Sequence, residues 1–581
     1  MDSLSNQEDV SSATEMLYSE RKDFIIIGLT GRTGSGCSTV AKLLNMSFAN
    51  FAPPKPKEND FKNNEERKYQ TLYRYARSNW EYFTIIEVKN IILSFLLEND
   101  FKTFMSFIET IIIEDQHLLQ IVKTELDENI KIKFNDLHTK RVHIKSRVEG
   151  DERALKEEDI YKYYFIDLPA FINDFEETLK KHGDIYTRLF QAFGNNIRIS
   201  GSPYDSQFKP KNIFRLSQRI NKLIKILRRR NLEKKGRVLA VIDAFRNPYE
   251  ATFFKDRYSS FYLFSVNTED ETRIKRLIEK GLDIEEIKRL DEQEYPLKQL
   301  GKDKFVSQNI QKCIELADVH LNNPTFGNSN HSFLKKLLIK YISLIMHPGL
   351  VTPTHEERCM QIAFNAKLNS GCLSRQVGAV VCDADYSIKS VGWNNTAEGQ
   401  VPCNLRNLSS LLRKDDQQAF SFFEFNDEEY YKYILKFKEK INDEKNLNGR
   451  CFAYCFKDTY NSFEKKKNQV HTRSLHAEEN AFLQIAKYGG VSLKNGYLFT
   501  TASPCELCSK KAYQIGMKKI YYIDPYPGIS NDHILKCGKN IPEMRLFYGA
   551  IGSAYYQLYM PIIPYKDELY MLLDIDLTKF T

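Results

Sequence analysis

Three side chains with the spacing of zinc ligands lie in the C-terminal part of the chain. His476 is followed two positions later by Glu478, and Cys505 and Cys508 are three positions apart. An imidazole and two thiolates can fill three corners of a tetrahedral zinc site and leave the fourth for a water, whose pKa then falls toward ~7. The pattern predicts a hydrolytic Zn²⁺ centre with ligands His476, Cys505 and Cys508, in which Glu478 is the catalytic proton carrier.

Two helix starts must position these ligands. We expect one helix over residues 477–487, ended by Gly489, and a second that begins at Cys505 and stops near Gly516. Helix N-termini favour negative charge, which suits thiolate and hydroxide. The alternative is a closed structural zinc site, but such a site has no need of a carboxylate beside the histidine.

Length, charge and cysteine content set broad limits. The chain has 581 residues, a formal net charge of +8 and 11 cysteines, which predicts either several units of roughly 150 residues or two large domains. The charge permits a polyanionic partner, and nucleotide phosphates are enough to explain it. Apolar runs of about 18 residues are absent from the sequence, and the N-terminus lacks the pattern of a signal peptide. We therefore expect a cytoplasmic protein without a membrane partner, whose cysteines are thiols or metal ligands.

A glycine-rich loop lies near the N-terminus. The apolar run 24–29 predicts a buried strand that leads into this loop and then into an amphipathic helix, which is the context of a phosphate-binding P-loop. A second buried strand, 238–243, ends in an acid at the usual place of a magnesium ligand. The residues that we expect to bind a nucleotide and Mg²⁺ are Gly31, Gly34, Gly36, Ser38, Thr39 and Asp243.

This loop departs from the P-loop pattern at one position. Cys37 stands where the pattern has lysine, so the charge that steadies the β- and γ-phosphates is absent. Arg32 is the candidate substitute. We expect phosphate binding without efficient phosphoryl transfer. The segments 28–31 and 242–248 resemble the nucleoside and nucleotide kinase branch of P-loop proteins.

The chain is predicted to be of the α/β class with two domains. Residues 1–348 are expected to form a P-loop NTPase (kinase-like) domain with a parallel sheet and a large, mostly helical insertion at about 50–235. Residues 349–581 are expected to form an α/β/α domain with an insertion at about 404–470. His347 to Gly349 break the predicted helix 332–346 and mark the boundary.

Inside the first insertion, helices are expected over 80–97, 118–128 and 217–230. The basic run from Arg228 to Arg230 is interpreted as a solvated helix end rather than a nucleic-acid contact.

The second domain resembles deoxycytidylate deaminases over about residues 350–545. Strands are expected over 377–382 and 387–392, with Arg375 shortly before Val377-Gly378-Ala379-Val380 and an imperfect turn, Gly392-Trp393-Asn394-Asn395. With the metal motif, which is also the pattern of zinc nucleobase deaminases, these residues carry the resemblance. It implies that Asn394 helps to hold the nucleoside, and we place Ala477 with it as a substrate contact. Trp393 could equally belong to the core.

The complete layout resembles the antiphage cytosine nucleotide deaminases of bacteria. The resemblance implies deamination of free dCTP and dCMP to the uracil nucleotides, control by the N-terminal domain through a regulatory nucleotide, an RNA or a protein partner, and a homo-oligomer. A housekeeping dCMP deaminase and a polynucleotide cytosine deaminase are the alternatives. Acids such as Glu424 and Glu428 alternate with the aromatics of 420–431, which opposes a phosphate backbone. An active kinase fused to a deaminase is disfavoured by Cys37.

A second, structural zinc is a further hypothesis. Cys372 and Cys403 occupy positions where some deoxycytidylate deaminases place ligands of such a zinc, and one or two of Cys451, Cys455 and His471 would complete the set. Buried free cysteines are the equally weighted alternative.

Overall fold

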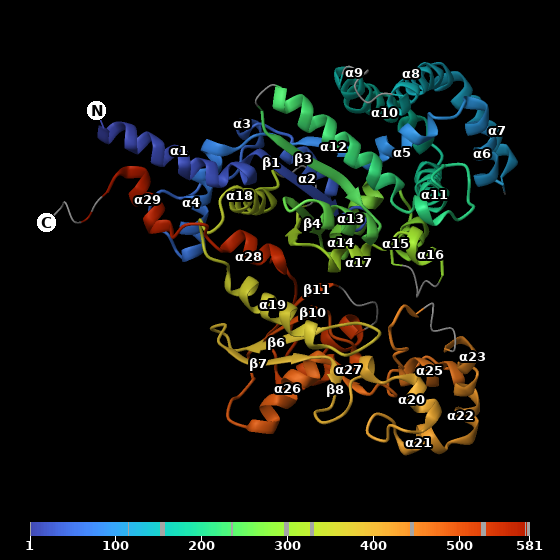
Figure 1. The fold of residues 1–581 in the computed structure, drawn as a ribbon, viewed down its shortest axis with the longest axis vertical. Coiled ribbons are helices and arrows are strands. Elements are labelled where there is room, and N and C mark those ends of the chain that lie inside the picture. The colour runs from blue at the N-terminus through green and yellow to red at the C-terminus, as the bar shows by residue number, and fades with distance from the viewer. Residues whose placement is uncertain are drawn as a thin grey trace. The chain divides into compact units, whose positions relative to one another are not determined.

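The computed structural model describes residues 2–113, 115–150, 157–233, 236–295, 301–325, 330–441, 447–524, 530–575 and 577. The chain divides into two compact units: residues 1–352 together with 553–581, and residues 353–552. They are called the first and second unit below (Figure 1). Among the helices of the described ranges, none is long and apolar enough to cross a membrane.

The first unit is built on parallel strands in the order β5-β4-β1-β3-β2. The central strands β1, β3 and β4 are almost fully buried, as expected for a parallel sheet covered on both faces, and the predicted positions of β1 and β3 are confirmed. The strand bounds are β1 (Phe24–Thr30), β2 (Thr84–Glu87), β3 (Val238–Phe245), β4 (Phe261–Asn267) and β5 (Val319–Asn322).

The prediction of one helix over residues 80–97 is wrong. Thr84–Glu87 is instead the edge strand β2, and helix α5 (Val88–Leu96) follows it without a turn. Ile85 and Ile86 lie opposite Val241 and Ile242 of β3. Pairing with a distant strand therefore overrides the local pattern, which runs unbroken from strand to helix because no glycine or proline separates them.

Helices α5 to α12 pack against one another and against the sheet in a single apolar core. Phenylalanine dominates it, with Phe104 in contact with Phe134 and Phe175 at ring-centroid distances of 5.4 and 5.7 Å. Figure 1 shows these helices in blue to green. The helix bounds before β3 are α1 (Asp2–Asp23), α2 (Cys37–Leu44), α3 (Phe48–Phe51), α4 (Asn64–Asn79), α5 (Val88–Leu96), α6 (Phe101–Ile111), α7 (Gln116–Asn129), α8 (Lys131–Gly150), α9 (Glu157–Lys162), α10 (Leu168–Lys180), α11 (Ile185–Ser200) and α12 (Arg215–Glu233).

The C-terminal residues of the chain return to the first unit. The Glu568 carboxylate on α29 accepts a hydrogen bond from the Tyr18 hydroxyl at 3.1 Å and lies 2.7 Å from the His347 imidazole. All three side chains are buried. The remaining helices of this unit are α13 (Pro248–Arg257), α14 (Asp270–Glu279), α15 (Ile284–Glu294), α16 (Asp303–Val306), α17 (Ile310–Glu315), α18 (Ser332–Met346), α28 (Ser553–Tyr559) and α29 (Tyr565–Leu573).

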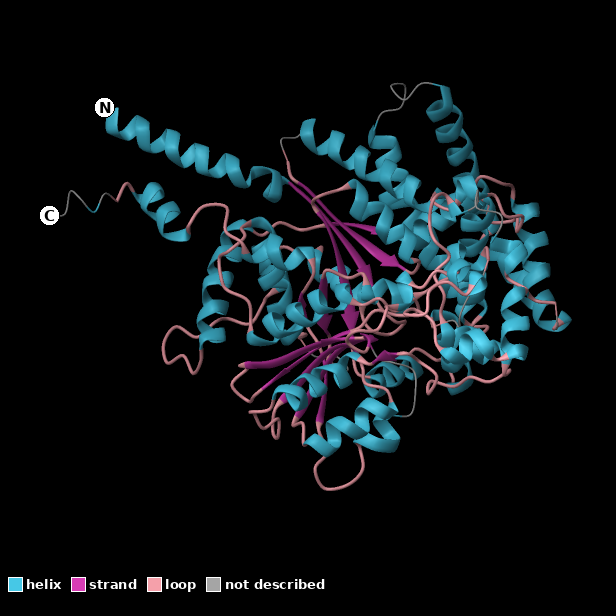
Figure 2. Ribbon diagram, turned by 60° about the horizontal axis from the view of Figure 1, so that its bottom comes forward, coloured by secondary structure: helices cyan, strands magenta, loops and turns pink. Residues whose placement is uncertain are grey.

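The second unit contains a mixed sheet in the order β12-β11-β10-β6-β7. Strands β7, β6 and β10 are antiparallel neighbours, whereas β10, β11 and β12 run parallel. Figure 2 shows the strands in magenta. The strand bounds are β6 (Gly378–Cys382), β7 (Ile388–Trp393), β8 (Asn395–Thr396), β9 (Ser474–Leu475), β10 (Tyr497–Ala502), β11 (Lys519–Asp524), β12 (Glu543–Leu546) and β13 (Gly549–Ala550).

Helices cover both faces of this sheet. Ala379 and Val381 of β6 pack with helices α26 and α27. Cys382, on the opposite face because side chains alternate along a strand, contacts Cys359 of α19. The domain is therefore an α/β/α arrangement. The helix bounds are α19 (His355–Ala366), α20 (Leu408–Arg413), α21 (Phe422–Asn426), α22 (Glu428–Leu435), α23 (Lys438–Ile441), α25 (Phe456–Phe463), α26 (Ala477–Tyr488) and α27 (Glu506–Ile515).

The described residues of 404–470 form a small helical layer with its own core, in which Phe420, Phe425 and Tyr430 are buried. The fully buried Arg406 guanidinium pairs there with the Glu424 carboxylate and donates to the Ala419 carbonyl at 2.8 Å.

Candidate functional site

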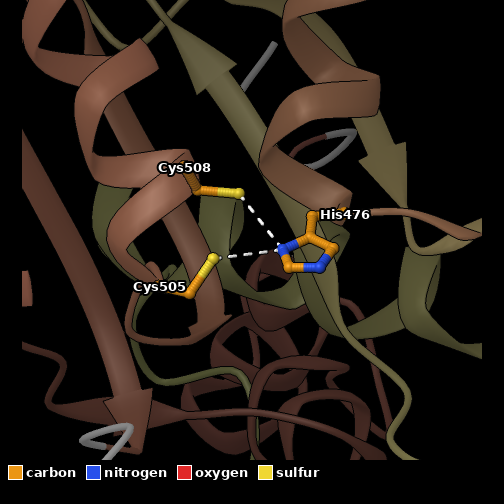
Figure 3. Close-up of side chains that lie close together, drawn as sticks. All are labelled: His476, Cys505 and Cys508. Atoms are coloured by element: carbon orange, nitrogen blue, oxygen red, sulfur yellow. Dashed lines mark hydrogen bonds between the residues drawn. The ribbon is translucent and has the colours of Figure 1, made fainter. Parts of the chain in front are cut away.

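The predicted zinc ligands meet at the N-termini of two helices (Figure 3). His476 is the N-cap residue of α26, Cys505 is the N-cap residue of α27, and Cys508 lies in the first turn of α27. The Nδ1 atom of His476 lies 3.2 Å from the Cys505 sulfur and 3.4 Å from the Cys508 sulfur. All three ligand atoms lie within 4.8 Å of one another. One nitrogen and two sulfurs at this spacing fit the donor set of a zinc ion with one open position.

A glycine sets the position of the histidine. The main chain of α26 lies so close to β7 that a Cβ atom on Gly392 would come 2.3 Å from the Ala477 carbonyl oxygen and 2.4 Å from the Ala481 nitrogen. A side chain here would push α26 away from the sheet and move His476 with it. In the sequence, Gly392 ends the predicted strand 387–392 and begins the imperfect turn, but the close approach of main chains leaves no local signal.

The charges at the site favour thiolate. The Cys508 thiol donates a hydrogen bond to the Cys505 sulfur and His476 lies beside it, which lowers the pKa of Cys505 to about 4. The hydrogen bond to Cys505 raises the pKa of His476 in turn. The positive ends of the α26 and α27 dipoles point at the same place and favour negative charge there. A thiolate is the form of cysteine that binds metal.

Glu478 lies beside the ligands with its side chain almost fully enclosed. Its exposed fraction is 4%, and the Thr500 hydroxyl donates a hydrogen bond to its Oε1 at 3.1 Å. Burial raises the pKa of the Glu478 carboxyl. The neighbouring Glu479 forms an ion pair with Lys511 instead. Glu478 is therefore the carboxyl group that the fold places against the predicted metal.

His476, Cys505 and Glu478 open onto a cavity of about 220 Å³. Asn394 and Ala477, the two predicted substrate contacts, both line it. The Asn394 side chain also holds the adjoining loop: its Oδ1 accepts from the Val377 amide at 2.7 Å and its Nδ2 donates to the Arg375 carbonyl at 2.6 Å. Contact between Asn394 and a substrate stays a prediction.

Two cations on this cavity were not predicted as site residues. Arg375 lines it and pairs with the buried Asp524 carboxylate. Lys457, on α25 of the 404–470 segment, also lines it and lies 3.6 Å from the partly exposed Asp458. The sequence carries no signal for Lys457, because it is one of many lysines in that segment and only folding brings it to the cavity.

The residues predicted for nucleotide binding line a separate cavity of about 730 Å³ in the first unit. Gly31, Gly34, Gly36, Ser38, Thr39 and Asp243 all belong to its lining. Gly34 and Gly36 have φ values of 88° and 110°, which favour glycine. The Asp243 carboxyl accepts a hydrogen bond from Ser38, while burial raises its pKa. Binding of a nucleotide or Mg²⁺ at this cavity stays a prediction.

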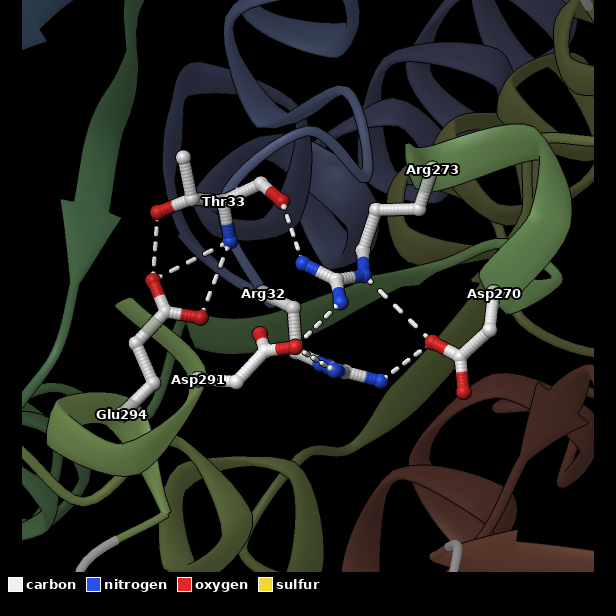
Figure 4. Close-up of polar contacts among 6 residues, drawn as sticks. All are labelled: Arg32, Thr33, Asp270, Arg273, Asp291 and Glu294. Carbon is white, nitrogen blue, oxygen red and sulfur yellow. Dashed lines mark hydrogen bonds and ion pairs between the residues drawn. The ribbon is translucent and has the colours of Figure 1, made fainter. Parts of the chain in front are cut away.

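Arg32 is held by two carboxylates (Figure 4). It pairs with Asp270 and, at 2.9 Å, with Asp291. The amide of the next residue, Thr33, donates to both oxygens of the buried Glu294 at 3.1 Å. The charge of Arg32 is therefore balanced within the protein, and Arg32 does not replace the missing lysine as an unpaired cation.

The cysteines of the second zinc hypothesis are only partly brought together. Cys372, Cys403 and Cys455 line a small cavity of about 20 Å³. Cys451 is exposed, and the ring of His471 packs against Tyr460. Within the described parts of the chain, His476, Cys505 and Cys508 are the one group of three or more ligand atoms that meets the spacing of a metal site. The second zinc stays a prediction.

Comparison with known families identifies the stretch that holds this site. Residues 353–524 match the family model of the cytidine and deoxycytidylate deaminase zinc-binding region. The three predicted ligands and Glu478 all lie inside the matched stretch.

Individual relatives are similar to part of the chain. The deoxycytidylate deaminases of Enterobacteria phages T2 and T4 are each 27% identical over 172 residues, covering 29% of this chain and 78% and 76% of theirs. ComE operon protein 2 of Bacillus subtilis (strain 168) is 41% identical over 54 residues, 9% of this chain and 28% of that protein. The crystal structure of dCMP deaminase from the cyanophage S-TIM5 in complex with dCMP and dUMP is 24% identical with a TM-score of 0.20, covering 34% of this chain and 99% of that chain.

Removal of one ligand is expected to remove one zinc. Cys508→Ser should lower the zinc content of the purified protein by about one ion per chain, because a hydroxyl is a poor replacement for a thiolate. Mass spectrometry of the metal in digested protein measures this. Cys537→Ser, at an exposed cysteine outside the site, is the matched control. Equal zinc in the two variants would contradict the ligand assignment, and about one zinc per chain in the unchanged protein would contradict the second site.

Proposed function

We propose that the chain deaminates free deoxycytidine nucleotides, dCMP, dCTP or both, to the corresponding uracil nucleotides and ammonia. Residues 353–524, which match the zinc-binding region of cytidine and deoxycytidylate deaminases, would carry the reaction. One observation supports this most strongly: the enclosed Glu478 carboxyl lines the same cavity as His476 and Cys505. Hydrolytic removal of an amino group needs both an activated water and a proton carrier.

The residues divide the chemistry between them. When bound by His476, Cys505 and Cys508, zinc supplies a Lewis acid that makes water a nucleophile near neutral pH. Glu478 accepts a proton from the attacking water and passes it to N3 of the ring. It then takes the second proton from the new C4 hydroxyl and passes it to the amino group. A C4–O bond forms, the C4–N bond breaks and ammonia leaves. The raised pKa of Glu478 suits a group that must both accept and donate protons.

The cations on the cavity support a phosphorylated substrate. The Arg375 charge is balanced by the buried Asp524, so Arg375 contributes mainly to shaping the loop. Among the described residues, the ion-pair partner of Lys457 is Asp458, at the longer distance of 3.6 Å between Nζ and Oδ1. Its ammonium group is therefore the better candidate to bind the substrate phosphate, as a point charge.

A polynucleotide substrate is less well supported. Stacking of successive bases needs exposed aromatic rings beside a basic groove. In the 404–470 segment, Phe420, Phe425 and Tyr430 are buried in its own core. Phe422 is exposed, but the exposed Glu428 lies in the same stretch, whereas Glu424 is buried in its ion pair with Arg406.

The wider biological role rests on the resemblance described for the sequence. We include in the proposal that dCTP depletion serves as an antiphage defence, and that the first unit controls the deaminase through the glycine-rich loop cavity. The contact of Ser38 with Asp243 supports a Mg²⁺-nucleotide in that cavity. Nucleotide binding that is unchanged in Asp243→Asn would contradict the proposed control by the first unit.

We also propose that the protein is a homo-oligomer. Light scattering of the purified protein tests this by measuring its mass in solution.

Loss of the proton carrier should strongly lower turnover without loss of metal. Glu478→Gln is expected to lower kcat for dCMP and dCTP by roughly 10²–10⁴-fold. Uracil products are measured by chromatography against a panel of cytidine and deoxycytidine nucleosides and nucleotides. Glu479→Gln is the control and should keep most activity, because Glu479 pairs with Lys511. Turnover near the unchanged rate in Glu478→Gln would refute the assigned role.

Loss of the Lys457 ammonium group, which is proposed to bind the substrate phosphate, should weaken turnover of nucleotides but not of nucleosides. Lys457→Ala is expected to raise KM for dCMP by about tenfold, which corresponds to about 1.4 kcal/mol, and to leave deoxycytidine turnover unchanged. Steady-state kinetics on both substrates measures the difference. Lys466→Ala, at an exposed lysine of the same segment outside the cavity, is the control. Equal effects on dCMP and deoxycytidine would show that Lys457 does not bind phosphate.

The two hypotheses, a defence enzyme and a housekeeping enzyme, differ in whether the first unit restrains the deaminase activity before infection. Deamination of dCTP in cells that carry the protein is expected to rise after phage infection, because the basal activity is restrained. Nucleotide pools are measured before and after infection, with Glu478→Gln as the inactive control. The same activity in both states would favour the housekeeping alternative.

A further inference from the structure

Helix α12 has one apolar and one basic face. Leu216, Ile220, Leu223 and Leu227 are buried in the core of the first unit. Arg215, Arg219, Lys222 and Arg229 recur at intervals of three, four and seven residues, which places them along one side of the helix. The sequence suggested only a solvated helix end, but this side of α12 faces a cavity.

The cavity has a volume of about 460 Å³ and a strongly positive lining. Its cationic lining residues are Arg141, Arg215, Arg219, Lys222, Lys225, Arg229 and Arg257, and together they are called the α12 site. Glu98 is the one acidic residue in the lining as described. The site shares no residue with the cavity of the glycine-rich loop.

The floor of the α12 site holds two buried guanidinium groups. Arg141 and Arg219 both pair with Glu98, and their side chains are 8% and 10% exposed. Arg219 also lies over the Phe95 ring, 3.2 Å from its centroid. One carboxylate cannot balance two guanidinium charges, so a positive charge remains where little water can solvate it.

The rim adds charge of the same sign. Lys222, Lys225 and Arg257 are exposed around the opening. Among the residues that the structure describes, no carboxylate forms an ion pair with these three or with Arg215. Like charges gathered around one cavity repel one another and raise the local concentration of anions. An anion with several charges would relieve both the floor and the rim.

We propose that the α12 site binds a small ligand that carries several phosphate groups. Guanidinium forks bind phosphate oxygens in pairs, and lysines add point charges at the rim. The volume falls within the range of small-molecule sites, so a compact ligand fits better than an extended strand. Phe253 and Tyr164 in the lining give an apolar wall for a base or other ring. The inference does not depend on the proposed deamination.

Inorganic tripolyphosphate is the probe, and calorimetry on the full chain without added magnesium is the measurement. The expected result is saturable binding that weakens at least tenfold in Lys222→Glu/Lys225→Glu. Two controls should leave it unchanged. Lys102→Glu/Lys181→Glu makes the same charge change at exposed positions of the first unit outside the cavity. Ser38→Ala/Asp243→Asn alters the glycine-rich loop cavity.

Any result that differs from this expected binding pattern overturns the proposal. Equal binding by the Lys222→Glu/Lys225→Glu variant and the unchanged protein would place the anion elsewhere, as would loss only in the Ser38→Ala/Asp243→Asn variant. A single-stranded oligonucleotide that binds while tripolyphosphate does not would exclude a small ligand as the class. Circular dichroism confirms that the surface variants fold, because both lysines are exposed.

Discussion

The candidate active site depends on two helix N-termini that meet at one point. Helices α26 and α27 both pack on the sheet of the second unit, and their first residues bring one imidazole and two thiols within 4.8 Å. The two dipoles favour thiolate at this point. The glycine in β7 allows α26 to approach closely enough for the arrangement to form. The chemistry therefore rests on close packing of main chains against a sheet.

Charge is balanced residue by residue around the catalytic cavity. The buried Asp524 takes up the charge of Arg375, and Thr500 holds the Glu478 carboxyl. Lys457 is the cation with the weakest compensation there. Burial without a partner is costly for a charged group. A cation that stays partly hydrated and has no strong partner can therefore bind a substrate phosphate in place of water. This balance connects the proposed substrate to the geometry of the cavity.

In the first unit, charge is arranged differently around the glycine-rich loop cavity and around the α12 site. Around the glycine-rich loop, carboxylates from α14 and α15 hold Arg32 and Thr33, and a neutral thiol at Cys37 stands in the lysine position. Burial raises the pKa of Cys37 to about 12, so it contributes no charge near neutral pH. Around α12, in contrast, cations outnumber the described acids. A weakly charged loop and a strongly positive groove would suit different ligands.

Local patterns of the sequence are sufficient for much of this molecule. Buried parallel strands appear as continuous apolar runs, and β1 and β3 lie where those runs predict them. The spacing of the ligands, together with the glycines that end the helices, was enough to predict that the metal ligands lie at helix starts. These features depend on neighbours only a few residues apart, which a single sequence records directly.

Contacts between distant residues were decided by the tertiary structure alone. Strand β2 exists because β3, more than 150 residues later, offers it a partner, and no turn residue marks its end. Lys457 reaches the cavity and residues 553–575 join the first unit only through folding. The charges of α12 are visible in the sequence, but the cavity beside them is not. The sequence by itself determined the kind of chemistry, and the fold decided which charges surround it, because burial and pairing arise only when remote segments pack together.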